Sequence, residues 1–538
     1  MRPEDARRDA WRRVLLALML LGGIGLTYLI FNVSRFERLG DVNAMDYAQV
    51  ARHVARGDGF VTSFIKPLSL VHVRRVEGHP DLTYPPLHIM WTAGMMKLLG
   101  ANDRAVSHAS GLAFLLTMPV VFWLALRMFD WRTAVLATAL CGTHIMLLGY
   151  AVSGLETSLL GLLLTLALLC LYNVATTEGN ELPWAGAAGV IIGLIYLTKY
   201  VWIVAAVPVL VYLLLVKPER RWARAGLFVG LVVVVALPWL IRNYNVTGSP
   251  FFTLRTYEMF GQTRAHPANT IYRTFRDHYQ SYLSFLFENP RAVFEKLRQG
   301  LNTFYASFPG LGGLFVTPFF LVAILVRLGR PPVEWVRLLV YGVMVVLMVS
   351  LSLVMADPRL MAPTGPVIIV IATAFFWRLL DARLQNVDDR SRIRWMAVAV
   401  GVLVLLQMQP YVTEVTPDEP YDSLGESPLE NAATQLAAIV EDPVLTDAPW
   451  IVAWMSDHDA VWLPQTETDF HKLEEAVGRF QWLFLTPDVA RRAAIENLER
   501  WADVWVAAQQ GDARYLGFVV SARLSDGRWV LMERESSD

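Results

Sequence analysis

Acidic and basic side chains stand at the ends of several long apolar segments of this sequence. The acids are Asp46, Glu156 and Asp357, and the bases are Lys199, Arg242 and Arg359. A charged residue at membrane depth is costly, so each of these is a candidate functional residue. Lysine and arginine suit a phosphate group, and a carboxylate can accept the proton of a hydroxyl group. Because the orientation argued below places all six on one face of a membrane, the set predicts a lipid-linked phosphate substrate.

Each candidate also has an ordinary structural interpretation. Residues 46–55 have the pattern of an amphipathic helix, and Asp46 suits the N-cap of such a helix. Pro85 and Pro86, downstream of His79, are typical of a rigid corner before a helix. At this level both the structural and the functional interpretation stay open for these positions.

Glu156 and Lys199 lie where almost no loop separates two apolar segments. A single acid in such a turn serves solubility, and a lysine there can extend its ammonium to the membrane interface. Arg242 and Arg359 suit interfacial anchors in the same way. Three cations and three acids on one face nevertheless exceed what anchoring needs, so the sequence favours a functional site.

The composition shows which elements must position these residues. Of the 538 residues, 55% are hydrophobic and 18% are charged, and the mean hydropathy is +0.40. A soluble domain has about 25% charged residues. Here long uncharged stretches alternate with short basic clusters, which predicts a polytopic α-helical membrane protein and excludes a disordered or fibrous chain. The net charge of −1 leaves no basic excess for nucleic acid, so no nucleic-acid partner is expected.

About eleven apolar segments are long enough to span a membrane. The first follows five arginines and is too long for the apolar core of a signal peptide, so we expect it to be retained as a helix. Lys199 divides the stretch 184–216 into two spans. The predicted spans lie near 14–33, 105–126, 133–152, 157–175, 184–199, 200–216, 225–241, 309–326, 336–355, 361–377 and 395–409.

The arginines of the short loops predict the orientation. Basic clusters before the first span and near 127–132, 217–224, 327–337 and 378–394 place the N-terminus in the cytoplasm. The loops 35–104 and 243–308 and the C-terminus then lie on the opposite, non-cytoplasmic side. We expect an integral protein of a bacterial inner (cell) membrane with a periplasmic or extracellular C-terminal domain.

The composition changes after the last predicted span. The sequence predicts a membrane module over 1–409, an acidic linker over 410–426 and a soluble α/β domain over 427–538. If residues 450–455 form a strand, the side chains on both of its faces are apolar, which is typical of a buried central strand. Helices are expected at 428–441, 467–478 and 487–501, and strands at 450–455, 481–486, 515–523 and 527–533. We expect this domain to contact the acceptor or cover the membrane site without performing chemistry, so a chain truncated near Tyr411 should retain some transfer.

The ordered set of motifs resembles a known family. After the first span come the helix with Asp46-Tyr47, the segment Pro85-Pro86-Leu87, the acidic turn at Glu156 and the Thr198-Lys199 span end. A Pro-Trp-x-x-Arg-Asn edge at Arg242 and an Arg-x-x-x-Pro edge at Arg359 follow. Over about residues 14–380 this order resembles the multi-spanning glycosyltransferases of fold type C (GT-C), which include protein O-mannosyltransferases and lipid A aminoarabinose transferases.

The resemblance implies a function for several of these residues. In this family a polyprenyl-phosphate sugar is the donor, and the acid of the first loop is the base or the group that orients the acceptor. Asp46 occupies that place, Asp41 is its rival, and Glu156 matches the acidic turn as a third catalytic candidate. Lys199, Arg359, Arg242 and His79 are the candidates for the donor phosphate. Tyr47 and Tyr84 are candidate acceptor or loop residues, and Tyr84 stands where the lipid A enzymes have lysine.

The chemistry implied is one inverting displacement by an acceptor hydroxyl at the anomeric carbon. A retaining reaction would also need a carboxylate nucleophile. The leaving phosphate is a stable anion, so no cofactor is required. A divalent cation stays possible, although no His/Asp cluster has the spacing of a metal site. The acceptor is a glycan, a lipid or a protein, and membrane lipid is a further partner. The alternative is a transporter or flippase of a lipid-linked or anionic substrate, for which broken helices at mid-membrane depth and smaller loops are typical.

Overall fold

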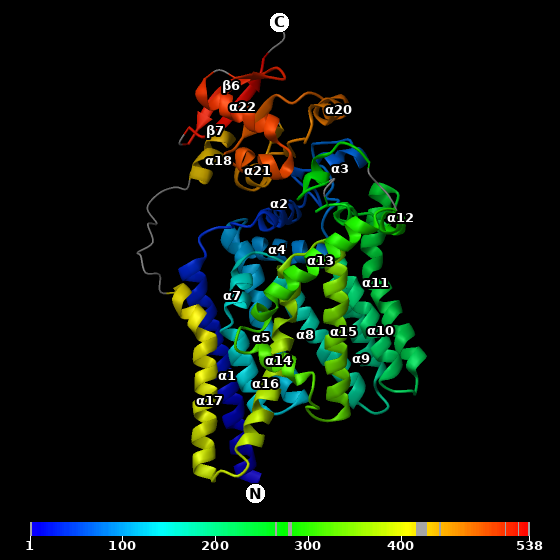
Figure 1. The fold of residues 1–538 in the computed structure, drawn as a ribbon, viewed down its shortest axis with the longest axis vertical. Coiled ribbons are helices and arrows are strands. Elements are labelled where there is room, and N and C mark those ends of the chain that lie inside the picture. The colour runs from blue at the N-terminus through cyan, green and yellow to red at the C-terminus, as the bar shows by residue number, and fades with distance from the viewer. Residues whose placement is uncertain are drawn as a thin grey trace.

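The structure is a computed structural model that describes residues 3–263, 266–277, 282–415, 428–440, 443–511, 513–525 and 527–535. It has three layers along its longest axis: a helical bundle, a middle layer made by two long loops, and a C-terminal domain (Figure 1). The start of α1 and the C-terminal domain lie at opposite ends of that axis.

The sequence predicts about eleven spans, and seven helices of the described chain are long and apolar enough to cross a membrane, so the protein is an integral membrane protein. They are α1 (Pro3–Arg35), α5 (Asp103–Met128), α8 (Thr157–Thr176), α11 (Arg221–Thr247), α15 (Pro331–Val354), the continuous pair η5 (Pro358–Thr364) and α16 (Gly365–Arg383), and α17 (Asp389–Val415). Helices α1 and α17 lie side by side at one edge of the bundle (Figure 1).

The remaining predicted spans are short or broken helices. α6 (Trp131–Gly142) and α7 (Ile145–Val152) meet at an angle of 56°, because the His144 ring caps α7 by accepting from the amides of Met146 and Leu147. The other short elements are α9 (Leu182–Tyr196), the 3₁₀ helix η1 (Tyr200–Ala205), α10 (Ala206–Leu215), η4 (Phe308–Leu311) and α14 (Thr317–Ala323). The predicted segments therefore fall mainly on helical residues, but several of them are too short or too bent to be single straight spans, and 309–326 is non-helical over 312–316 and 324–326.

The middle layer contains the helices of the two loops. The first loop forms α2 (Val42–Arg56), strand β1 (Phe64–Ile65), α3 (Pro67–His72) and α4 (Pro86–Leu99). Asp41, not Asp46, is the N-cap of α2, since its carboxylate accepts from the amides of Asn43 and Ala44. The second loop forms η2 (Leu254–Met259), η3 (Thr270–Arg273), α12 (Tyr282–Glu288) and α13 (Pro290–Ser307). Helices α2 and α4 lie across the end of the bundle, directly below the C-terminal domain (Figure 1).

The C-terminal domain is built on one seven-stranded sheet of order β1-β3-β2-β4-β7-β6-β5. The pairs of β1, β3, β2 and β4 are parallel, and those of β4, β7, β6 and β5 are antiparallel. Its strands are β2 (Val444–Thr446), β3 (Ala460–Trp462), β4 (Trp482–Leu485), β5 (Arg514–Tyr515), β6 (Phe518–Leu524) and β7 (Trp529–Arg534). Its helices are α18 (Pro428–Ile439), α19 (Pro449–Ile451), the π-helical turn η6 (Val452–Ser456), α20 (Glu467–Val477), α21 (Asp488–Glu496) and α22 (Glu499–Gln510). The edge strand β1 comes from the first loop, so the sheet joins segments about 400 residues apart in sequence.

Four local predictions for this region are wrong. Residues 449–456 are helical and not a central strand, because a segment buried on all sides is apolar at every position and its periodicity cannot separate strand from helix. Helix α17 continues to Val415, beyond the predicted start of the linker at 410; the rest of that linker, 416–426, lies outside the described residues. The predicted helix 487–501 is two helices, and the predicted strand 515–523 is a hairpin of β5 and β6.

Candidate functional site

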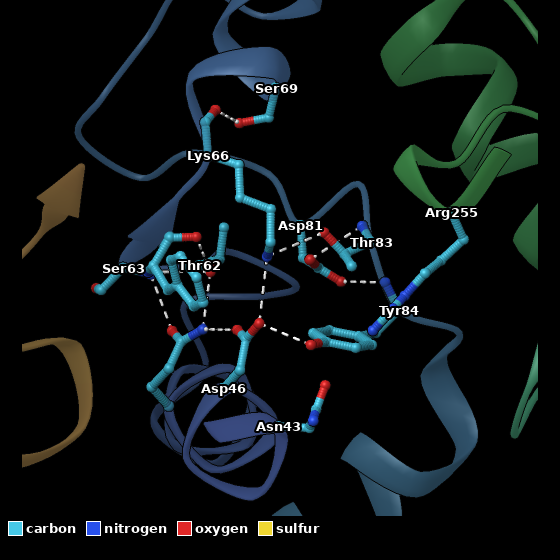
Figure 2. Close-up of polar contacts among 12 residues, drawn as sticks. Asn43, Asp46, Thr62, Ser63, Lys66, Ser69, Asp81, Thr83, Tyr84 and Arg255 are labelled. Carbon is cyan, nitrogen blue, oxygen red and sulfur yellow. Dashed lines mark hydrogen bonds and ion pairs between the residues drawn. The ribbon is translucent and has the colours of Figure 1, made fainter. Parts of the chain in front are cut away.

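Asp46 is buried in the first loop within a hydrogen-bonded network (Figure 2). One carboxylate oxygen accepts from the Tyr84 hydroxyl at 2.7 Å and lies 3.2 Å from the Lys66 ammonium. The other oxygen accepts from the Gln49 amide at 3.0 Å. A carboxylate has about four lone-pair positions, so these three contacts leave one position for a further donor such as a substrate hydroxyl.

Glu156 forms the second part of the site. It stands at the start of α8, is fully buried, and lies 2.7 Å from the Lys199 ammonium. Lys199 also donates to the Tyr47 hydroxyl at 3.2 Å. The rings of Tyr47 and Tyr84 lie 4.4 Å apart, so the Glu156–Lys199 pair and the Asp46 network are in contact through two tyrosines.

Arg359 and Asp41 complete this cluster. The guanidinium of Arg359 lies 3.0 Å from the Asp357 carboxylate and 3.9 Å from that of Asp41. Arg359 is nearly buried, whereas the Asp41 side chain is partly exposed. The contacts of Asp41 with Arg359 and with the amides of α2 that it caps fall on one carboxylate oxygen, whereas both oxygens of Asp46 are bound. The structure therefore brings together Asp41, Asp46, Tyr47, Tyr84, Glu156, Lys199 and Arg359, all of which the sequence singled out.

Two further charged residues, which the sequence analysis missed, join the cluster from the loops. Lys66 directly follows β1 and pairs with Asp46. Arg255, at the start of η2, lies 4.9 Å over the Tyr84 ring and pairs with Glu258. Both stand in loops without a helical or strand period, so no local pattern in the sequence marks them.

A cavity of about 280 Å³ opens next to these residues. Two cations line it, Lys199 from the bundle and Arg255 from the second loop. Its other walls include five aromatic side chains, Tyr84, Tyr196, Tyr200, Phe251 and Phe252, and also Glu258, which pairs with Arg255. Two cations in a cavity with aromatic side chains fit a phosphate that carries an apolar or sugar group.

Two predicted phosphate-binding residues do not reach this cavity. Arg242 stacks 4.7 Å over the Trp239 ring and donates to the Phe60 carbonyl at 3.3 Å. His79 is buried in the first loop, and its Nδ1 bonds the Arg75 carbonyl at 2.7 Å. Burial lowers the pKa of His79 to about 4, so its ring is neutral near pH 7 and supplies no charge for a phosphate. Both residues hold the first loop in place.

This burial of His79 predicts how stability depends on pH. The folded pKa lies below the ordinary value of 6.5, so the unfolded chain binds the proton first. The stabilisation is therefore complete above the ordinary pKa and is lost as the pH falls from there through the folded value. Between pH 7.5 and pH 5 we expect a loss of about 2 kcal/mol from this residue. Thermal unfolding of wild type and His79→Gln over this range measures it, and equal slopes in the two proteins would contradict it.

No group of three or more His, Cys, Asp and Glu side chains that could hold a metal ion occurs among the residues that the structure describes. The charged groups of the site form cation–carboxylate pairs instead. Such an arrangement can bind an anion through its cations and accept a proton at a carboxylate.

Comparisons with known proteins agree with this arrangement. Residues 83–241 match the family model described as dolichyl-phosphate-mannose-protein mannosyltransferase. ArnT from Cupriavidus metallidurans, in a crystal structure bound to undecaprenyl phosphate, is 15% identical with a TM-score of 0.56 over 99% of both chains. AglB, the oligosaccharyltransferase of Archaeoglobus fulgidus in complex with an inhibitory peptide and a dolichol-phosphate, is 11% identical with a TM-score of 0.59, over 98% of this chain and 75% of its own. No curated protein matches the chain by sequence.

The chain thus has the fold of the membrane glycosyltransferases of type C, which is the resemblance that the sequence motifs indicated. The matched family region, 83–241, runs from Thr83 to Ile241 within α11 and includes Glu156 and Lys199.

Proposed function

We propose that the protein is a glycosyltransferase that moves a sugar from a polyprenyl-phosphate donor to an acceptor on the non-cytoplasmic side of the membrane. The observation that carries this proposal is the hydrogen bond from Tyr84 to a buried carboxylate, Asp46. Tyr84 lines the same cavity as the two cations Lys199 and Arg255. Solved structures of ArnT and AglB, which share the fold, hold undecaprenyl phosphate and a dolichol-phosphate, and this supports a donor of the same chemistry here.

The reaction follows from these groups. The acceptor hydroxyl forms a bond to the anomeric carbon while the bond from that carbon to the phosphate oxygen breaks, which inverts the configuration. Asp46 accepts the hydroxyl proton at its remaining lone-pair position. Lys199, Arg255 and the nearby Arg359 stabilise the charge that grows on the departing lipid monophosphate. Glu156 holds the Lys199 ammonium in place.

The orientation belongs to the same proposal. With the N-terminus in the cytoplasm, the site and the C-terminal domain lie on the other side, because they occupy the end of the molecule opposite to the start of α1 (Figure 1). We propose a bacterial inner (cell) membrane as the location. A glycan, lipid or protein acceptor then approaches from the non-cytoplasmic side.

The decisive experiment is donor consumption by purified protein in detergent. Undecaprenyl-phosphate sugars of several kinds are supplied with candidate glycan, lipid and peptide acceptors, and release of undecaprenyl phosphate is measured. Transfer of sugar to an acceptor, with inversion, is the expected result. Detergent abolishes any gradient, so a transporter or flippase forms no product in this assay. Binding of lipid phosphate without product in any combination would favour that alternative.

Transfer is expected to continue in excess EDTA. The leaving phosphate is a stable anion, and the side chains of Lys199, Arg255 and Arg359 supply positive charge where a metal ion otherwise would. Turnover before and after chelation measures this, with added Mg²⁺, Mn²⁺ or Zn²⁺ as the reverse test. Loss of turnover in EDTA and its return with one of these ions would show that a divalent cation takes part.

A further inference from the structure

The position of Lys66 depends on the C-terminal domain. Lys66 directly follows β1, which consists of Phe64 and Ile65 alone. This strand pairs in parallel with β3 of the C-terminal domain, and the Ala460 amide donates to the Ser63 carbonyl at 2.7 Å. A two-residue strand has no stability of its own, so the partner strand fixes where the Lys66 ammonium meets Asp46.

Helix α2, which carries Asp46 and Tyr47, is bound by the same domain through Arg52. The Arg52 guanidinium donates to the carbonyls of Trp454 and Ala453 at 2.8 and 2.5 Å. It also pairs with Asp457 at 2.7 Å and stacks 4.9 Å over the Trp454 ring. Only 7% of its side chain is exposed. One planar side chain therefore fixes α2 to the helical turn η6, whose helical geometry the sequence analysis missed.

The second loop is held in a corresponding way. The Arg273 side chain, at the end of η3, is fully buried against the C-terminal domain, 3.1 Å from the Glu496 carboxylate and 4.6 Å over the Trp462 ring. Residues of α2, both loops and the C-terminal domain share one apolar core, which includes Tyr47, Phe64, Tyr257, Trp450 and Trp454. The domain thus contacts both loops that contribute cations to the site.

We propose that the C-terminal domain is the frame that positions the Asp46–Lys66 pair, and that Arg52 is a positioning residue for catalysis. The domain acts through β1 and α2 and touches no reacting atom itself. This changes the expectation for a chain truncated near Tyr411: without β3 and η6, neither Lys66 nor α2 is held, and transfer should be lost. The link to catalysis rests on the proposed function, whereas the link to loop structure does not.

Arg52→Ala against Arg56→Ala is the matched test. Both arginines lie on α2, and both pair with Asp457. They differ in burial, because the Arg56 side chain is 48% exposed. Hydrogen exchange of peptides over 60–70 is expected to quicken about tenfold or more in Arg52→Ala, since hydrogen bonds from a charged donor are lost. Exchange should stay at the wild-type rate in Arg56→Ala, and exchange in α8 should stay unchanged in both. Equal exchange over 60–70 in the two variants would overturn the proposal.

A split between turnover and binding separates positioning from a general loss of fold. Because small misplacements of reacting groups are costly, Arg52→Ala should lower kcat about 100-fold, while the affinity for undecaprenyl phosphate stays near wild type. Arg52→Lys keeps the charge toward Asp457 but cannot hold both carbonyls, and it should recover part of the turnover. Equal losses of turnover and lipid affinity would contradict a positioning role.

A protease site inserted within 416–427 tests the domain without a substitution in the interface. After cleavage of the full-length protein, the C-terminal domain should co-elute with the membrane part in gel filtration and turnover should persist. Separation of the two parts with unchanged exchange over 60–70 would overturn the proposal. The exchange and co-elution measurements need no sugar donor, so they decide the structural claim even if the proposed reaction is wrong.

Discussion

Asp46→Asn is expected to abolish sugar transfer, with a fall in turnover of about 10²- to 10⁴-fold. Asparagine has nearly the shape of aspartate, but its amide cannot accept the proton of the acceptor hydroxyl. The Asp46 carboxylate is 2% exposed and bound on both oxygens, so the site offers it little freedom to move. Turnover of an undecaprenyl-phosphate sugar by purified protein is the measurement.

The same substitution leaves the Lys66 ammonium buried without its partner, and this should cost about 3–5 kcal/mol of stability. The double variant Asp46→Asn/Lys66→Met removes both charges. It should regain most of the thermal stability and none of the turnover, which separates chemistry from folding.

Asp41→Asn is the comparison that decides between the two acids. Asparagine is as good an N-cap as aspartate, so α2 should keep its start and the variant should stay folded. We expect it to retain most of its turnover. Loss of turnover in Asp41→Asn together with near wild-type turnover in Asp46→Asn would move the base to Asp41, and full activity in both would contradict a single carboxylate base.

The sequence predicted the parts of the site that depend on membrane topology. Glu156, Lys199 and Arg359 stand at the ends of apolar segments, and the ends that face the same side of a membrane lie near one plane. Their charges are conspicuous because membrane depth makes charge rare. The order of these ends along the chain therefore predicts that they form one cluster with the helix that carries Asp46.

The loop residues could not be predicted in this way. Lys66 and Arg255 belong to segments whose conformation is set by partners distant in sequence, and no local period marks them. The apolar run at 450–455 is helical, although its pattern predicts a strand. The run is buried on nearly all sides, and such a segment has no period that separates a strand from a helix. Strand β1 is too short to give a period of two, so its pairing with β3 had no signal in the sequence.

Lys199→Met is expected to weaken the binding of undecaprenyl phosphate strongly. Removing one partner of a desolvated charge pair costs around 2–5 kcal/mol, which is about 30- to 5,000-fold in affinity. An ammonium has three donors, and Glu156 and the Tyr47 hydroxyl occupy two of them, so one remains for the phosphate. Lys199 also lines the cavity directly. Titration of the lipid phosphate into purified protein measures the change.

The single substitution also leaves the buried Glu156 carboxylate unpaired, which by itself destabilises the fold. The double variant Lys199→Met/Glu156→Gln restores a neutral site and should recover thermal stability while lipid binding stays weak. Lys97→Met, at an exposed lysine of α4, is the control for loss of one positive charge. If the double variant binds the lipid phosphate as tightly as wild type, Lys199 only serves the fold, and the phosphate must be bound by Arg255 and Arg359. Arg255→Met would then show the larger loss of affinity, because Arg255 is the other cation that lines the cavity.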